Sequence, residues 1–170
     1  MAIWVEQIED ERVIHGTEDG VLHVSGRVRL LGHAYDGVHI HPGGTLITSG
    51  IIGKWLRIDT GGAFYSSGLV SAQPQLADDA ILEIRGELSV PRLPRELHGT
   101  ILIAVGARYN DQVLRPDGTL IPRVGIEGGN AQSSAPRYRI AAGGREPVLH
   151  PATALELSAY SLGDDVVPSY

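Results

Sequence analysis

The 170-residue sequence contains no cysteine, which excludes disulfide bridges, thiolate metal ligands and cysteine nucleophiles. It has one phenylalanine and one methionine, so its apolar residues are mostly Val, Ile, Leu and Ala. No stretch approaches the roughly 18 apolar residues that a membrane-spanning helix needs, and we expect no membrane span. The start, MAIWVEQIEDER, lacks the basic region and apolar run of a signal peptide, which predicts a cytoplasmic protein.

Positive charge is also scarce, with 14 basic against 20 acidic residues and a formal net charge of -6. A general nucleic-acid surface needs a basic face, so we expect no nucleic-acid partner. An acidic chain remains compatible with a basic protein partner. Aromatic residues make up only 5%, too few for the stacking platforms of a typical polysaccharide-binding groove.

Two adjacent stretches are copies of one repeat. VHIHPGGTLITSGIIGK (38–54) and LRIDTGGAFYSSGLVSA (56–72) align at an offset of 18 residues. The Gly-Gly and Ser-Gly pairs coincide, and the apolar positions agree in phase. Each copy opens with apolar-polar alternation, the period-2 pattern of a strand with one buried face, and each glycine pair permits a sharp corner.

Short strands joined by glycine corners, recurring every 17 to 18 residues, describe one coil of a parallel β-solenoid. We therefore predict an all-β protein with no helix: a single short parallel β-solenoid of roughly five to seven coils with an irregular C-terminal insertion. LHVSG before the clear copies, and LEIRGELSV, ILIAVG, YRIAAGG and LELSAY after them, are weaker candidate copies. QPQLADDA is interpreted as a surface loop inserted between coils.

One domain accounts for the whole chain, because 170 residues can bury a core without further support. Its predicted parts are an N-terminal cap (1–20), coils (21–106), a loop insertion (107–137), and C-terminal coils with a tail (138–170).

Three histidines form the one candidate metal site. On an outward-facing strand His39 and His41 point the same way, and His23 stacks beside His39 on the preceding coil. Three imidazoles so placed can bind zinc or another divalent ion. His33 and Asp36 in the preceding turn are candidates to complete the site.

A plainer interpretation is a solvated ladder of mixed charges. The equivalent positions in later coils are read as Arg57 and Asp59, then as Glu83 and Arg85, and exposed cross-strand pairs of this kind contribute only tenths of a kcal/mol. We prefer the ladder and predict no cofactor, with the divalent metal at His23, His39 and His41 as the alternative. No catalytic or cofactor-binding residue is predicted.

Two family resemblances bear on function. His-x-His followed by Pro-Gly-Gly resembles the first metal motif of cupins, small barrels that bind metal, although GGTLIT stands where the cupin glutamate falls. The glycine-punctuated rhythm of residues 22–106 resembles the β-helix core of bactofilins, bacterial cytoskeletal proteins that join end to end into filaments without nucleotide. That resemblance implies a structural protein that assembles with itself.

These observations favour a non-enzymatic protein-interaction or scaffold protein, either bactofilin-like in its self-association or neutralising a basic toxin as its protein partner. The alternative is a metal-dependent cupin-like enzyme that uses His39 and His41. A carbohydrate-handling β-helix ranks last, because aromatic residues are few.

Overall fold

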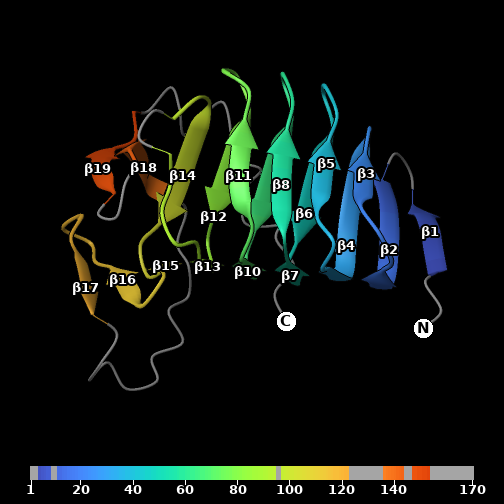
Figure 1. The fold of residues 1–170 in the computed structure, drawn as a ribbon, viewed down its shortest axis with the longest axis horizontal. Helices are drawn as coiled ribbons and strands as arrows, with labels where there is room; N and C mark the ends of the chain where they lie inside the picture. Colours follow the sequence, from blue (N-terminus) through green and yellow to red (C-terminus); the bar gives the residue numbers. More distant parts are fainter. Residues whose placement is uncertain (1–3, 9–10, 95–96, 123–135, 144–146, 154–170) are drawn as a thin grey trace.

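The computed structural model describes residues 4–8, 11–94, 97–122, 136–143 and 147–153. In these residues the chain is all-β and forms a parallel β-solenoid of about five turns, which confirms the predicted fold class (Figure 1). None of the described residues forms a helix long and apolar enough to cross a membrane.

The strands belong to two sheets. The smaller sheet contains β3 (Leu22–Val24), β5 (Val38–Ile40), β8 (Trp55–Ile58) and β11 (Gln73–Leu76). The parallel middle of the larger sheet contains β2 (Glu11–Glu18), β4 (Arg27–Ala34), β6 (Thr45–Thr48), β9 (Ala63–Ser66), β12 (Ile81–Ile84) and β14 (Thr100–Ala104). The remaining side of the coils is built from β7 (Ile51–Ile52), β10 (Leu69–Val70), β13 (Glu87–Leu88) and β15 (Arg108–Tyr109).

The middle coils lie in register at the spacing of 18 that the sequence repeat predicts, whereas β2 with β4 and β3 with β5 pair at a spacing of 16, and β12 with β14 at 19. Val38 pairs with Leu56, and Leu46 pairs with Phe64. Such partners point inward and stack into columns, and all four of these side chains are fully buried. One continuous apolar core therefore runs along the solenoid, built mainly from branched aliphatic residues.

Two kinds of glycine make the corners. Gly43 and Gly61 have φ angles of 75° and 70°, which a residue with a side chain rarely adopts. Gly50 is needed for a different reason, since a Cβ atom there would lie 1.6 Å from the backbone oxygen of Gly32 on the preceding coil. At this second corner the coils approach too closely for any side chain.

The interpretation of QPQLADDA as an inserted loop is wrong. Its first four residues form β11, which pairs with β8 in the same 18-residue register. Proline is tolerated there because β11 is the last strand of its sheet, so its missing N–H leaves no gap inside the ladder.

The pairing of β11 with β8 also corrects the placement of Glu83 and Arg85. Gln75, not Glu83, is the partner of Arg57 on the next coil. Glu83 lies in β12 beside Tyr65 of β9, in the other sheet, and its side chain is fully buried. Arg85 Nε donates a hydrogen bond of 2.6 Å to Glu83 Oε1, so these two residues are a buried ion pair and not part of a solvated ladder.

Antiparallel strands lie at both ends of the solenoid. At the N-terminal end β1 (Trp4–Ile8) pairs with β2. At the C-terminal end β16 (Gln112–Leu114) and β17 (Leu120–Pro122) continue from β15, while β18 (Pro136–Ala142) and β19 (Val148–Pro151) continue from β14, all antiparallel. YRIAAGG is therefore not a further coil, because its strand residues belong to the antiparallel β18; LELSAY lies outside the described residues.

Candidate functional site: a histidine cluster on the four-stranded sheet

The first two histidines occupy matching places on neighbouring strands. His23 on β3 and His39 on β5 are register partners, as the repeat predicts. Their strand neighbours on either side are buried in the core, so strand alternation turns both imidazoles outward. His23 is exposed, and the side chain of His39 is only 18% exposed.

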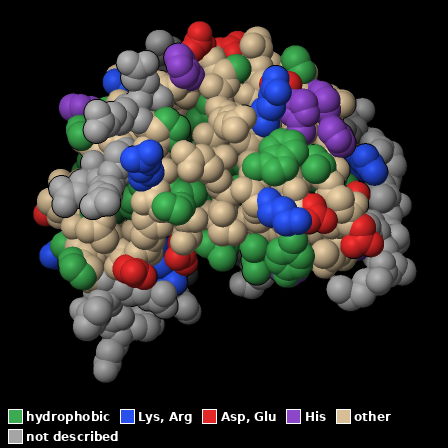
Figure 2. Space-filling view, in the orientation of Figure 1, with side chains coloured by type: hydrophobic (Ala, Val, Ile, Leu, Met, Phe, Trp, Pro, Cys, Tyr) green, Lys and Arg blue, Asp and Glu red, His purple; other side chains and the backbone are tan. Residues whose placement is uncertain are grey.

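The third histidine approaches from the corner after β5. The backbone N–H of His41 donates to Val24 O of the preceding coil at 2.8 Å, which holds this corner against β3. Its ring centroid lies 4.0 Å from that of His39, and its Nε2 lies 3.0 Å from His23 Nδ1. One ring nitrogen from each histidine can be chosen so that all three lie within 4.8 Å of one another. Figure 2 shows the histidines as one group over the N-terminal strands.

A carboxylate from the next coil holds His39. Asp59 occupies the corner equivalent to that of His41, and its Oδ2 lies 2.7 Å from His39 Nε2. Arg57 Nε donates to the other carboxylate oxygen at 2.9 Å. The hydrogen bond from His39, followed by that from Arg57, lowers the pKa of Asp59 below its ordinary value of 3.8. Asp59 is therefore a stable anion that fixes the orientation of the His39 ring.

His33 and Asp36 do not complete the cluster as expected. His33 Nδ1 accepts the backbone N–H of Ile51 at 3.0 Å, and its ring stacks on Tyr35. Asp36 forms an ion pair with Lys54, and its other oxygen accepts the backbone N–H of Gly20 at 3.1 Å. Both side chains are thus engaged in joining one coil to the next.

Further aromatic and amide side chains lie on or beside the same sheet. Trp55 on β8 lies against Gly37, where an added Cβ atom would be 2.9 Å from the indole ring. Tyr35, in the turn that leads into β5, is 45% exposed. Gln73 and Gln75 of β11 are exposed at the far end of the sheet.

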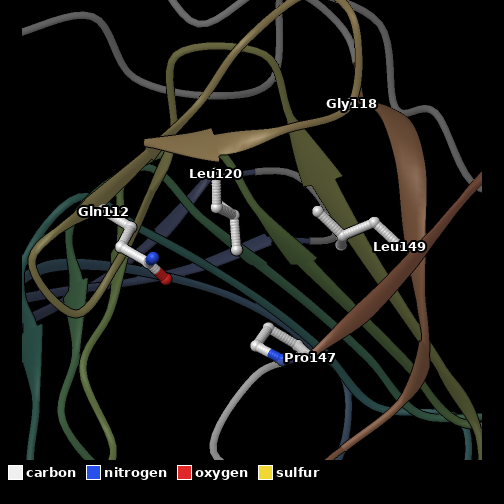
Figure 3. A pocket seen from close by; sticks show the side chains of 5 residues that line it. All are labelled: Gln112, Gly118, Leu120, Pro147 and Leu149. Carbon is white, nitrogen blue, oxygen red and sulfur yellow. The ribbon is translucent and has the colours of Figure 1, made fainter. Parts of the chain in front are cut away.

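A separate hollow of about 360 Å³ lies at the C-terminal end of the molecule (Figure 3). Leu120 of β17 and Leu149 of β19 point into the space between the two antiparallel units. Its other lining residues are Gln112, Gly118 and Pro147. Among the described residues that line the hollow, none has a titratable side chain.

Comparison of this chain with family models, with curated proteins and with solved structures gives no match.

Sequence reasoning found the three histidines but missed the role of Asp59, which it treated as one more solvated charge. The missing signal was available in the repeat. Asp59 lies 18 positions after His41 and takes the same corner one coil further on. There its carboxylate is within hydrogen-bond distance of His39.

Proposed function

We propose that this protein is a non-enzymatic interaction protein that binds a protein partner through the outward face of β3, β5, β8 and β11. The observation that carries the proposal is the composition of this regular, parallel surface. Exposed Tyr35, partly buried Trp55 and exposed Arg57 lie on or beside a short sheet whose opposite side is fixed in the core. Tyr, Trp and Arg are the residue types that contribute most to binding at protein interfaces.

The sheet also limits the entropic cost of binding. Its backbone is hydrogen-bonded on successive coils, and several surface side chains already have partners, including Arg57 with Asp59 and Lys54 with Asp36. A surface whose side chains are ordered before binding loses less freedom on association. The net charge of -6 favours a basic partner, as a toxin-neutralising role requires. A cytoplasmic location remains a prediction from the sequence.

Bactofilin-like assembly is the less supported form of this proposal. End-to-end growth of a solenoid adds a parallel coil to a free parallel edge. Here β1 pairs antiparallel with β2 at one end, and β18 pairs antiparallel with β14 at the other. These strands change the pairing direction at both ends, and they favour binding through the side of the solenoid over growth along its axis.

The cupin-like enzyme loses its structural support. A cupin site lies in a barrel, whereas His39 and His41 lie on the outside of a parallel solenoid. The three imidazoles nevertheless lie close enough together to act as ligands of one metal ion.

Two residues with similar fractional exposure, one beside the proposed face and one away from it, supply a pair of variants that tests this face. Tyr35 and Val148 are the exposed large hydrophobic residues of the described chain, at 45% and 47%. Quantitative affinity purification should find a specific protein that the wild type and Val148→Ala retain equally, and that Tyr35→Ala and Gln75→Arg lose. Equal retention by all four proteins would contradict the proposed face. Light scattering and electron microscopy should show small discrete particles, and filaments would instead support end-to-end assembly.

A further inference from the structure

We propose that His23, His39 and His41 bind one Zn²⁺ ion, with Asp59 as the carboxylate that orients His39 and a fourth coordination position open to solvent. This inference rests on the geometry of the cluster alone and does not depend on the proposed protein partner.

The spacing of the three imidazoles is close to that of a zinc site. Nitrogens bound tetrahedrally to Zn²⁺ at about 2.0–2.1 Å lie roughly 3.4 Å apart. His23 Nδ1 and His41 Nε2 are already 3.0 Å apart, and the most distant pair of the three lies within 4.8 Å. His23 is exposed and His41 half-buried, so small side-chain rotations close the remaining gap without moving the backbone.

The hydrogen bond between His23 and His41 marks where the ion goes. Two imidazole nitrogens at 3.0 Å share one hydrogen between two lone pairs. When the ring that holds this hydrogen shifts it to its other nitrogen, both lone pairs face the same point. A Zn²⁺ ion at that point accepts both lone pairs and replaces the shared hydrogen.

Asp59 supplies the outer support typical of zinc-binding histidines. A neutral His39 that donates from Nε2 to Asp59 Oδ2 keeps its lone pair on Nδ1, which selects the nitrogen that binds metal. Arg57 holds the other oxygen of Asp59, so the carboxylate has a fixed orientation. A solvated ladder of charges does not require this carboxylate–histidine geometry beside two further imidazoles.

The donor set determines the class of ion. Neutral imidazoles suit Zn²⁺ and neighbouring late transition metals, whereas Mg²⁺ and Ca²⁺ prefer oxygen ligands. Within the described residues the cluster contains three histidines and no directly ligating carboxylate. Three protein ligands leave one position of a tetrahedral ion for water or for a donor atom of a bound molecule.

Equilibrium dialysis of the full chain against ZnCl₂, followed by elemental analysis, tests the proposal. We expect one Zn²⁺ per chain, no binding from MgCl₂, and a rise of roughly 5–10 °C in the thermal unfolding midpoint at a hundredfold excess over Kd. Cobalt substitution should give the visible absorption of a tetrahedral ion with nitrogen ligands.

Variants distinguish zinc binding by the three proposed ligands from zinc binding by histidines elsewhere in the chain. His23→Asn and His41→Asn should each abolish the stoichiometric site, and Asp59→Asn should weaken binding 10- to 100-fold while one site per chain remains. His98→Asn is the matched control, because His98 pairs with Asp78 on the surface at 2.9 Å and lies outside the cluster. Circular dichroism of the metal-free variants verifies that each is folded.

Two results would overturn the zinc site. One is wild-type protein that binds less than one Zn²⁺ per chain at micromolar free metal. The other is binding that His98→Asn reduces as much as His41→Asn does. Loss of zinc in the His41→Asn variant with partner retention unchanged would leave the proposed function standing, which keeps the two failures distinct.

Discussion

At the scale of single residues, the inward columns of the solenoid contain two hydroxyl groups with different environments. Thr48 and Ser66 are register partners and both are buried. Thr48 Oγ1 donates to Leu30 O at 2.8 Å and accepts the backbone N–H of Gly50 at 2.9 Å. The Ser66 hydroxyl has no hydrogen-bond partner in the described structure. A hydroxyl group therefore stabilises one coil, whereas in the next coil the loss of its hydration is not offset by a hydrogen bond.

Removing each hydroxyl should have opposite consequences. Thr48→Val keeps the side-chain shape but leaves the Gly50 N–H without this acceptor, so we expect a loss of about 1–3 kcal/mol in the free energy of unfolding. Ser66→Ala should be neutral or stabilising by up to about 1 kcal/mol. Urea denaturation of the two variants measures both values. A larger loss for Ser66→Ala than for Thr48→Val would contradict this account.

Burial raises the pKa of Glu83 above its ordinary value of 4.5, although the hydrogen bond from Arg85 acts in the opposite direction. As pH rises above 4.5, the unfolded chain ionises Glu83 first, so this residue lowers the free energy of unfolding until the folded state also ionises. Glu83→Gln retains an oxygen that accepts from Arg85 and removes the titration. We expect the stability of the variant relative to wild type to increase from pH 4 to pH 7, as measured by urea denaturation. If the difference in the free energy of unfolding between the variant and the wild type stays constant over this range, or changes in favour of the wild type, burial does not penalise the charge of Glu83.

At the scale of the elements, the corner between the two runs of the larger sheet depends on glycine at one position per coil. Along this corner Gly50, Gly68 and Gly86 each leave space for the backbone oxygen of the preceding coil but not for a Cβ atom. The requirement repeats because each coil lies directly on the one before it.

Gly50→Ala should therefore destabilise the protein by roughly 3 kcal/mol or more, since the new methyl group meets backbone and not a movable side chain. Gly26 is the matched control, because a Cβ atom there has no neighbour within 4 Å. Gly26→Ala should change stability by less than about 0.5 kcal/mol. Thermal unfolding compares the two, and similar midpoints would refute the close approach of the coils.

The same elements show what a single sequence can and cannot predict. The 18-residue register was readable because glycine corners and apolar phase repeat together in 38–54 and 56–72. β11 was missed because its proline and the acids that follow it are typical of loops, while its edge position tolerates them. β18 was misassigned because apolar alternation does not distinguish a parallel from an antiparallel neighbour.

At the candidate site the sequence placed the histidines in the correct columns, but it could not show which side chains join them. Whether His33 and Asp36 face the cluster depends on where β4 ends and on the turn that follows it, whose backbone path no periodicity determines. In the structure His33 lies in β4 and contacts Ile51, and Asp36 lies in the turn after β4 and contacts Lys54, both on the next coil.

At the scale of the whole molecule, one stacking rule produces the core, the binding face and the histidine cluster. Pairing of β3 with β5 places His23 beside His39, and pairing of β5 with β8 places Asp59 within hydrogen-bond distance of His39. A shift of one residue in this register would turn the histidines into the core and disperse the site. Both proposals for the face therefore depend on the parallel register.

Cysteine cross-linking measures that register directly, and the cysteine-free chain provides a clean background. Arg57 of β8 and Gln75 of β11 are partners in the parallel register. An antiparallel register with Trp55 opposite Gln75 would keep the same side chains outward and would oppose Arg57 to Gln73. Under mild oxidation, the double variant Arg57→Cys/Gln75→Cys should form an intramolecular disulfide rapidly, and Arg57→Cys/Gln73→Cys should remain mostly reduced, because bridged Cα atoms lie about 4.4–6.8 Å apart. Faster closure of the 57–73 pair would contradict the stacked coils and the histidine cluster built on them.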